Sequence, residues 1–236
     1  MNLVRAALPL AAALAVACLF QPSWPGTARR ADAVVVIDIT QSMNVGDQMW
    51  EGRPVPRIEA VRRTLGEVLN RLPCGSRLGW AVFTEYRSFL LTTPMEVCAN
   101  RSELRGVLAH VDGRMAWSGN SEVAKGLNAA MRMASEVEGH PSLVFLTDGQ
   151  ESPPLSPSRQ PRFDGKPGEV PGVVVGVGGP VPLPIPKTDP AGRALGVWHA
   201  DEVMQTDPFS RSRARSEEHT SELQSPMYLV CRLLLE

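Results

Sequence analysis

The stretch DAVVVIDITQSM, residues 32–43, decides the fold of this chain. Its first part, DAVVVIDI, is a short and almost continuous apolar run, which is typical of a strand covered on both faces. Asp38 stands at the end of this run, and two hydroxyl residues, Thr40 and Ser42, follow it at spacings of two. Ligands bind at the carboxyl ends of the strands in open α/β sheets. We therefore expect an α/β fold with a functional site where this strand ends.

Strands and helices alternate along the rest of the chain. We expect, in order, a strand over 32–39, a helix after Pro56, a hairpin of strands over 76–84 and 87–95, a helix over 102–110, a helix starting at Ser121, and two further buried strands over 142–149 and 172–179. The first helix carries apolar residues at helical spacing: Ile58, Val61, Leu65, Val68 and Leu69. This alternation predicts a doubly wound, mostly parallel sheet of Rossmann-like type with one antiparallel edge hairpin.

Length and charge fit one globular domain, which we place at residues 31–210. The chain has 236 residues, a hydrophobic fraction of 43% and a formal net charge of -1. This length accommodates one ordinary domain with short additions at each end, but not two large domains. The basic residues are scattered along the chain, so the sequence lacks the basic face by which a protein binds nucleic acid.

The N-terminal segment, residues 1–30, is typical of an export signal or a membrane anchor. Arg5 precedes the apolar run AALPLAAALAVACLF, and Ala15 and Ala17 have the spacing of an A-x-A cleavage site. In a variant of this interpretation Cys18 carries a lipid. The alternative is a buried N-terminal helix of the domain. We expect the domain to lie outside the cytoplasm, exported or tethered.

The C-terminal segment, residues 215–236, shares no pattern with the rest of the chain. Its sequence, RSEEHTSELQSPMYLVCRLLLE, resembles the conceptual translation of a sequencing-library adaptor. We interpret it as a non-native tail and exclude it from the fold, as one excludes an expression scar. The alternative is a genuine amphipathic tail.

Two cysteines, Cys74 and Cys98, lie at the outer ends of the expected hairpin. Residues in these positions face each other across a strand pair, so a disulfide between them is sterically plausible. In an oxidising compartment such a bridge stabilises a fold by about 3 kcal/mol. The alternative is a pair of buried free thiols.

Three short segments carry the candidate chemistry: DITQSM, WSGNSEVAKGL and TDGQE. Together they gather five hard oxygen donors: Asp38, Thr40, Ser42, Ser121 and Asp148. Hard oxygen donors suit Mg²⁺, Mn²⁺ or Ca²⁺ rather than zinc or copper. Taken singly, Ser121 has another explanation as a helix cap, Asp148 as part of an Asp-Gly turn, and Asp38 as a polar strand end. Taken together and in this order, the segments predict a site for one divalent cation.

The order DxTxS, GNSEVAKGL and TDG resembles the metal-ion-dependent adhesion site of von Willebrand factor A domains. The resemblance implies that Thr40 and Ser42 contact the ion directly, while Asp38 and Asp148 lie close to it or just behind. Ser121 takes the place of the usual threonine, and Thr40 the place of the commoner serine. Mg²⁺ is then the first expectation. Neutral hydroxyl ligands leave a coordination position open, so the site grips an acidic side chain of a protein partner and is not enzymatic.

The rival interpretation is an enzyme in which Asp38 forms an aspartyl-phosphate, as in phosphotransferases and phosphatases. Such enzymes also need a loop lysine and paired acids for Mg²⁺, and TDGQE offers only Asp148 and Glu151. The histidines are scattered, and none pairs with a serine or cysteine in a catalytic arrangement. The glycines of GVGG lack the lysine of a phosphate-binding loop, so loop geometry explains them.

A closer resemblance concerns most of residues 31–200. The stretches DITQSMNVGDQ, LPCGSRLGWAVFTEYRSFLL, EVCANRSEL, RMAWSGNSEVAKGL, FLTDGQESPPL and GVGGPVPLPIPK look like A-domain proteins of the MxaL type, found with bacterial methanol oxidation. The resemblance implies an accessory factor at the periplasmic side of the bacterial inner membrane that helps insert calcium into methanol dehydrogenase.

The same resemblance suggests how the domain docks and where it ends. We expect the metal face to dock on that enzyme or a companion factor, with Met43, Met49, Trp50 and Trp117 nearby. The alternative for these side chains is packing under their loops. A domains normally end in another strand and a covering helix, and neither is evident after Gly179, so we expect truncation at the C-terminus.

Overall fold

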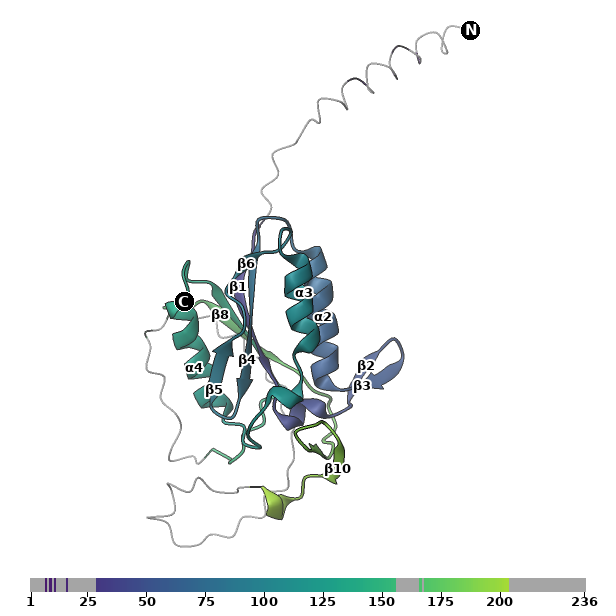
Figure 1. Cartoon of the computed structure of the whole chain (residues 1–236), viewed down its shortest axis with the longest axis vertical. Coiled ribbons are helices and arrows are strands. Elements are labelled where there is room, and N and C mark those ends of the chain that lie inside the picture. Colours follow the sequence, from purple (N-terminus) through teal and green to yellow (C-terminus); the bar gives the residue numbers. More distant parts are fainter. Residues whose placement is uncertain are drawn as a thin grey trace.

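The computed structural model describes residues 29–155, 166 and 168–203, together with positions 7, 9, 11 and 16. Its centre is a six-stranded sheet in the order β5-β4-β1-β7-β8, with β6 also paired to β4. The strands are β1 (Asp32–Asp38), β4 (Arg77–Thr84), β5 (Arg87–Leu90), β6 (Met95–Glu96), β7 (Ser142–Thr147) and β8 (Gly172–Gly176). The main helices are α2 (Arg57–Arg71), α3 (Arg101–His110) and α4 (Val123–Glu136) (Figure 1).

The sheet is mostly parallel, as the alternation of elements predicts. β1 lies in its centre and runs parallel to both β4 and β7, while β7 runs parallel to β8. Only β5 and β6 are antiparallel to their partner β4. The predicted α/β fold with an antiparallel edge hairpin is therefore confirmed. The carboxyl ends of β1, β4, β7 and β8 meet at one edge of the sheet, which is the edge where ligands bind in such folds.

Helices cover both faces of the sheet, because successive residues of a strand point to opposite sides. Val35 and Ile37 of β1 face α2 and α3, in a core that also contains Trp80. Val34 and Val36 face α4 on the other side. Figure 1 shows α2 and α3 side by side over one face of the sheet, and α4 over the other. This two-sided burial explains why β1 is an almost uninterrupted apolar run.

The expected strand over 87–95 is interrupted, so that prediction was wrong in its extent. The amides of Leu91 and Thr92 both donate to the carbonyl oxygen of Trp80, at 2.8 Å and 3.1 Å. Two residues opposite one form a β-bulge, which bends the strand and ends its regular pairing. The chain rejoins the sheet as β6, which pairs with the first residues of β4. β5 and β6 are thus two short strands.

The predicted strand over 172–179 is present as β8, but the prediction was wrong about its extent and its burial. β8 is the last strand of the sheet path and ends at Gly176. The side chains of Val173 and Val175 are 41% and 38% exposed. They pair with Val144 and Leu146, so they lie on the face of the sheet that α2 and α3 cover further along. Apolar composition alone does not distinguish a central strand from such an edge strand.

Two small hairpins were not expected from the sequence. One pairs β2 (Gln48–Trp50) with β3 (Arg53–Val55), and the other pairs β9 (Pro186–Thr188) with β10 (Ala194–Val197). Short 3-10 turns complete the fold: η1 (Gln41–Asn44), η2 (Gly113–Met115) and η3 (Ala200–Glu202). The β9–β10 hairpin and η3 return to the edge at which β1 ends. They become part of the surroundings of the candidate site.

A disulfide joins Cys74, in the loop before β4, to Cys98, which follows β6, with a Cα–Cα distance of 5.3 Å. The expected signal or anchor and the expected C-terminal tail lie outside the described residues, apart from four positions of the former. Within the described part of the chain, no helix combines the length and apolar character needed to cross a membrane.

Candidate metal centre

Asp38 organises the loop that follows β1. Its side chain is completely buried, and its Oδ1 accepts hydrogen bonds from the backbone amide of Thr40 at 2.9 Å and from Thr40 Oγ1 at 2.7 Å. Its Oδ2 accepts a hydrogen bond from Thr147 Oγ1, at the end of β7, at 2.6 Å. Thr40 Oγ1 lies 3.0 Å from Ser42 Oγ, within hydrogen-bonding distance. The Thr40 hydroxyl therefore lies against the carboxylate, and the Ser42 hydroxyl lies against that of Thr40.

Burial raises the pKa of Asp38 to about 7, and the nearby negative charge of Asp148 contributes to the rise. The hydrogen bonds from Thr147 and Thr40 act in the opposite direction. A buried carboxylate beside a second acid is costly to ionise, and a cation close to both relieves this cost. The electrostatics of the loop thus favour a positive charge at this place.

Asp148 comes directly after β7 and is also buried. Its Oδ1 accepts a hydrogen bond from the amide of Gln150 at 3.1 Å, and its Oδ2 forms an ion pair with Arg57 Nη1 at 2.7 Å. No motif in the sequence predicts this arginine. One carboxylate oxygen of Asp148 therefore already has a cationic partner.

Ser121 lies two residues before α4 and is buried. Its backbone exchanges hydrogen bonds with Ser152, at 2.9 Å from the Ser121 amide and 2.7 Å from the Ser152 amide. Its hydroxyl does not cap the helix, and Ser121 Oγ has no hydrogen-bond partner among the described residues. A buried hydroxyl without a partner is costly, which makes it a ready ligand for an ion.

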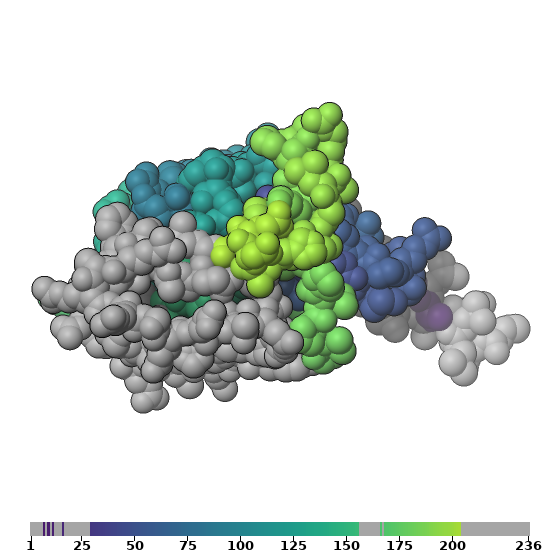
Figure 2. Space-filling model, turned by 90° about the horizontal axis from the view of Figure 1, so that it is seen from below, coloured from purple at the N-terminus to yellow at the C-terminus, as the bar shows by residue number. Residues whose placement is uncertain are grey.

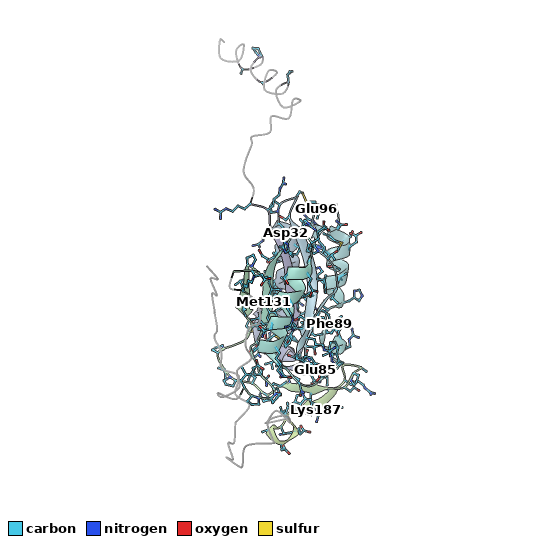
Figure 3. The ribbon with its side chains drawn as sticks, turned by 90° about the vertical axis from the view of Figure 1, so that its left-hand side faces the viewer. Asp32, Glu85, Phe89, Glu96, Met131 and Lys187 are labelled. Atoms are coloured by element: carbon cyan, nitrogen blue, oxygen red, sulfur yellow. A yellow bond between two sulfur atoms is a disulfide. The ribbon has the colours of Figure 1, made fainter. Side chains whose placement is uncertain are left out.

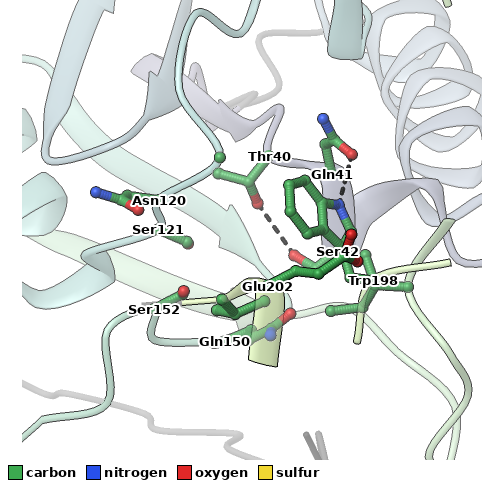
Figure 4. Close-up of a pocket in the computed structure, with 12 residues that line it drawn as sticks. Thr40, Gln41, Ser42, Asn120, Ser121, Gln150, Ser152, Trp198 and Glu202 are labelled. Carbon is green, nitrogen blue, oxygen red and sulfur yellow. Dashed lines mark hydrogen bonds between the residues drawn. The ribbon is translucent and has the colours of Figure 1, made fainter. Parts of the chain in front are cut away.

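Three of the five predicted donors, Thr40, Ser42 and Ser121, line one cavity of about 80 Å³ (Figure 4). Asp38 stands behind them, bonded to Thr40, and Asp148 lies beyond it, close enough to raise its pKa. The structure thus brings all five to one edge, three as lining and two as support. The hydroxyls, the unpartnered Ser121 oxygen and the two acids fit a hard divalent cation.

Comparison with protein families gives the identity of this domain. A family model described as von Willebrand factor type A domain matches residues 33–150, from the second residue of β1 to the loop after β7. The chain belongs to the von Willebrand factor type A family. A domains commonly mediate metal-dependent interactions with proteins. The matched range contains all five candidate donors.

Similar solved structures come from bacterial proteins. An uncharacterized membrane spanning protein from Vibrio fischeri is 21% identical, with a TM-score of 0.39, over 55% of this chain and 62% of that chain. PilB minor pilin from Streptococcus sanguinis is 16% identical, with a TM-score of 0.41, over 53% and 31% of the two chains. The pilus adhesin SpaC from Lactobacillus rhamnosus GG is 15% identical, with a TM-score of 0.39, over 73% and 22%. Each match spans less than two thirds of the other protein. No curated protein matches the chain.

The A-domain cavity includes residues that the sequence analysis missed. Alongside the hydroxyls it is lined by Gln41, Gly119, Asn120, Gln150, Ser152, Ile185, Trp198, Glu202 and Val203. Gln41 and Asn120 are adjacent to predicted donors in the sequence and Gln150 follows Asp148 by two residues, so this proximity was a usable signal. Ser152 follows Asp148 by four residues, and only its pairing with Ser121 brings it to the site.

The segment from β9 to η3 partly roofs this cavity. Trp198 Nε1 donates a hydrogen bond to Gln41 Oε1 at 2.7 Å, and the amide of Thr188 donates to the same oxygen at 3.2 Å. Gln41 lies between Thr40 and Ser42 in the sequence, so these bonds join the segment to the loop that carries both hydroxyls. Figure 2 shows the segment, green to yellow, lying across the lower end of the molecule. Sequence spacing carries no signal for this long-range contact.

The side chains expected beside the metal face divide into two groups. Met43 is completely buried and packs in the core with α2 and α3, so it is unavailable for docking. Met49 is exposed on β2, and Trp50 lies under the guanidinium of Arg63. Trp117 is exposed, donates to Glu85 Oε2 at 3.1 Å and packs edge-on against Phe89. The packing alternative therefore holds for Met43.

The nucleophile interpretation of Asp38 finds no support in this geometry. Both of its oxygens accept hydrogen bonds and its side chain has no exposed surface. An attacking carboxylate must reach its substrate, and lysine is not among the described residues that line the cavity. The arrangement suits a residue that orients its neighbours.

Proposed function

We propose that this A domain binds one divalent cation and uses it, without catalysis, to hold an acidic side chain of a protein partner. Mg²⁺ is the first choice, and Mn²⁺ or Ca²⁺ are the alternatives. The observation that carries the proposal is the buried Ser121 hydroxyl. It has no hydrogen-bond partner among the described residues and lines the same cavity as Thr40 and Ser42.

Each donor has a role that follows from its position. Thr40, Ser42 and Ser121 supply the neutral oxygens that line the cavity. Asp38 orients the Thr40 hydroxyl through its hydrogen bond, and Asp148 adds negative charge behind the hydroxyls. When bound, the cation acts as a Lewis acid that attracts an anionic ligand from outside. Because the lining oxygens are neutral, they cancel little of its charge.

The partner proposed in detail is a periplasmic methanol dehydrogenase or a companion maturation factor. This part of the proposal is supported by the sequence motifs shared with the MxaL-type proteins. In that role the domain acts at the periplasmic side of the inner membrane, exported or anchored through its N-terminal segment, and assists calcium insertion. The exposed side chains of Met49 and Trp117 are available for such docking.

Metal titration of the full chain tests the site. We expect Mn²⁺, followed by electron paramagnetic resonance of the free ion, to bind in one-to-one ratio and to be displaced by Mg²⁺. Asp38→Ala and Ser42→Ala should weaken binding by at least tenfold, because the first removes the group that orients Thr40 and the second removes a ligand. Ser102→Ala, an exposed hydroxyl on α3, is the matched control. Parent-like affinity in the two site variants would reject the metal site.

Affinity recovery from bacterial membranes tests the partner. The full chain should retain the dehydrogenase or an accessory subunit in the presence of Mg²⁺ and release it in EDTA, since the proposed contact runs through the ion. The Ser42→Ala variant should retain neither. Equal recovery with and without EDTA would contradict metal-dependent docking.

A further inference from the structure

Arg57, the first residue of α2, is charged but only 2% exposed. Its Nη1 donates to Asp148 Oδ2 at 2.7 Å, and its Nη2 donates to Asp47 Oδ2 at 2.7 Å. Its Nε donates to Asp47 Oδ1 at 3.0 Å. The guanidinium therefore bridges two carboxylates that belong to different loops of the metal edge.

The position of Arg57 is fixed from several sides. Its own amide donates to the carbonyl oxygen of Val45 at 3.0 Å, and its partner Asp47 accepts a hydrogen bond from the amide of Gly179 at 2.7 Å. Gly178 lies beside the guanidinium, and a Cβ atom added there would be 3.5 Å from it, at ordinary van der Waals contact. Since the planar fork is held on both sides, Arg57 presents a fixed positive charge to Asp148.

The positive charge of Arg57 offsets the repulsion between two buried carboxylates of the site when no ion is bound. Asp38 and Asp148 are both buried, and the charge of Asp148 raises the pKa of Asp38. Removing the partner of a buried charge is strongly destabilising, so Asp148 needs a cation whether or not a divalent ion is bound. Arg57 is the cation that the described residues place within ion-pair distance of it.

We propose that Arg57 is a resident cation of the metal site, which pairs with Asp148 when the site is empty and competes with the divalent ion for that carboxylate. The inference rests on the proposed metal binding. It makes Arg57 a positioning residue: it holds Asp148 Oδ2 away from the ion, so that the ion keeps more of its charge for a partner. Binding of the ion is correspondingly weaker and more readily reversed.

Arg57→Met in the full chain separates this role from ordinary packing. Without divalent ions, we expect its melting temperature to fall by about 10 °C, because Asp148 and Asp47 lose their buried partner. Its Mn²⁺ dissociation constant should fall by about tenfold, because a positive charge close to the ion is removed. The rise in melting temperature on adding Mn²⁺ should therefore exceed that of the parent. Arg57→Lys, which keeps the charge, should bind Mn²⁺ with an affinity close to the parent's.

Two further variants complete the design. Arg62→Met, on the same helix and paired with Glu59, is the matched control, with a parent-like dissociation constant. The double variant Arg57→Met/Asp148→Asn removes both charges, so its ion-free melting temperature should lie above that of Arg57→Met alone. This comparison does not require Mn²⁺ binding. A double variant no more stable than the single one would overturn the pairing.

The outcomes also separate the two proposals. If the parent chain does not bind Mn²⁺, the metal-binding function fails and this inference falls with it. If the parent binds Mn²⁺ normally and Arg57→Met has the same or a higher dissociation constant, only the role of Arg57 as a competing cation is overturned.

Discussion

Glu151 follows Asp148 by three residues, yet its side chain bonds to the N-terminus of α4 rather than to the loop that carries Thr40 and Ser42. Its Oε1 accepts a hydrogen bond from the amide of Ala124 at 2.8 Å, at the N-terminus of that helix. Free amides and the helix dipole favour a negative charge there. Burial nevertheless raises the pKa of Glu151 to about 7, and the nearby charge of Glu122 adds to the rise.

The raised pKa of Glu151 predicts that the free energy of unfolding depends on pH. Glu151→Gln, which cannot titrate, should remove this dependence. Between the ordinary value of 4.5 and about 7, folded Glu151 holds a proton that the unfolded chain has released. The contribution of the group is therefore fully present below pH 4.5 and is lost as the pH rises through 7. From pH 5 to pH 8, the parent should lose roughly 2–3 kcal/mol relative to the variant. Urea unfolding without metal at both pH values measures this, and parallel losses would contradict it.

The sequence could predict the hydroxyls and acids of the site because they follow buried strands or open a helix. Asp38, Thr40 and Ser42 belong to one short motif, and Ser121 and Asp148 follow the same rule. Arg57 and Trp198 carried no such signal. An arginine after a proline looks like an ordinary helix start, and its pairing with Asp148, 91 residues away, is a product of the fold.

Among the elements, α4 packs more closely against the sheet than its composition suggests. Gly126 faces Phe83 of β4, which is completely buried. A Cβ atom on Gly126 would lie 2.0 Å from one ring carbon of Phe83 and 2.2 Å from another. The carbonyl oxygen of Gly126 also accepts a hydrogen bond from Ser88 Oγ of β5 at 2.9 Å. The absent side chain of Gly126 thus lets the helix approach the strands.

Gly126→Ala should destabilise the fold by about 1–3 kcal/mol, because the methyl group overlaps the ring and must push the helix or Phe83 aside. Gly106→Ala on α3 is the matched control, since nothing lies within 4 Å of its added Cβ atom. That substitution should stabilise by up to about 1 kcal/mol through helix propensity. Urea unfolding measures both. A change of the same sign in the two variants would contradict the packing argument.

The order and type of the main elements could be predicted, while their ends and the small hairpins could not. Apolar periodicity reflects which face is covered, and it located β1, α2, α3, α4 and β7 well. The bulge at Leu91 and Thr92 depends on one carbonyl of β4, which no local pattern encodes. The β9–β10 hairpin is mostly exposed, so it lacks the alternation that reveals a strand.

At the scale of the whole molecule, the last part of the described chain lies against the loop that follows β1. After β8 it runs through β9, β10 and η3, and Ile185, Trp198 and Glu202 line the cavity beside Ser42. Lys187 Nζ lies 4.6 Å from the ring centroid of Trp198 and forms an ion pair with Glu202 Oε1. The segment therefore has its own internal contacts in addition to its bonds with Gln41.

Trp198→Ala should loosen this segment without disturbing the sheet. The change removes the bond to Gln41 and the ring that Lys187 covers, so we expect amide exchange in β9, β10 and η1 to accelerate by about tenfold or more. Exchange in β1 should stay unchanged, because its amides are held by β4 and β7. Leu195→Ala, at a side chain 60% exposed in β10, is the control. Equal acceleration in both variants would show that the tryptophan does not anchor the segment.

The two ends of the domain, taken along β1, carry different features. Asp32 and Glu96 lie at one end, near the Cys74–Cys98 bridge, and Glu85 and Lys187 lie at the other (Figure 3). β1 has seven residues, which at about 3.3 Å per residue span roughly 20 Å. Residues that precede the domain join it at the disulfide end. A segment that attaches the domain through this end therefore joins it roughly 20 Å, the length of β1, from the edge that carries the candidate metal site.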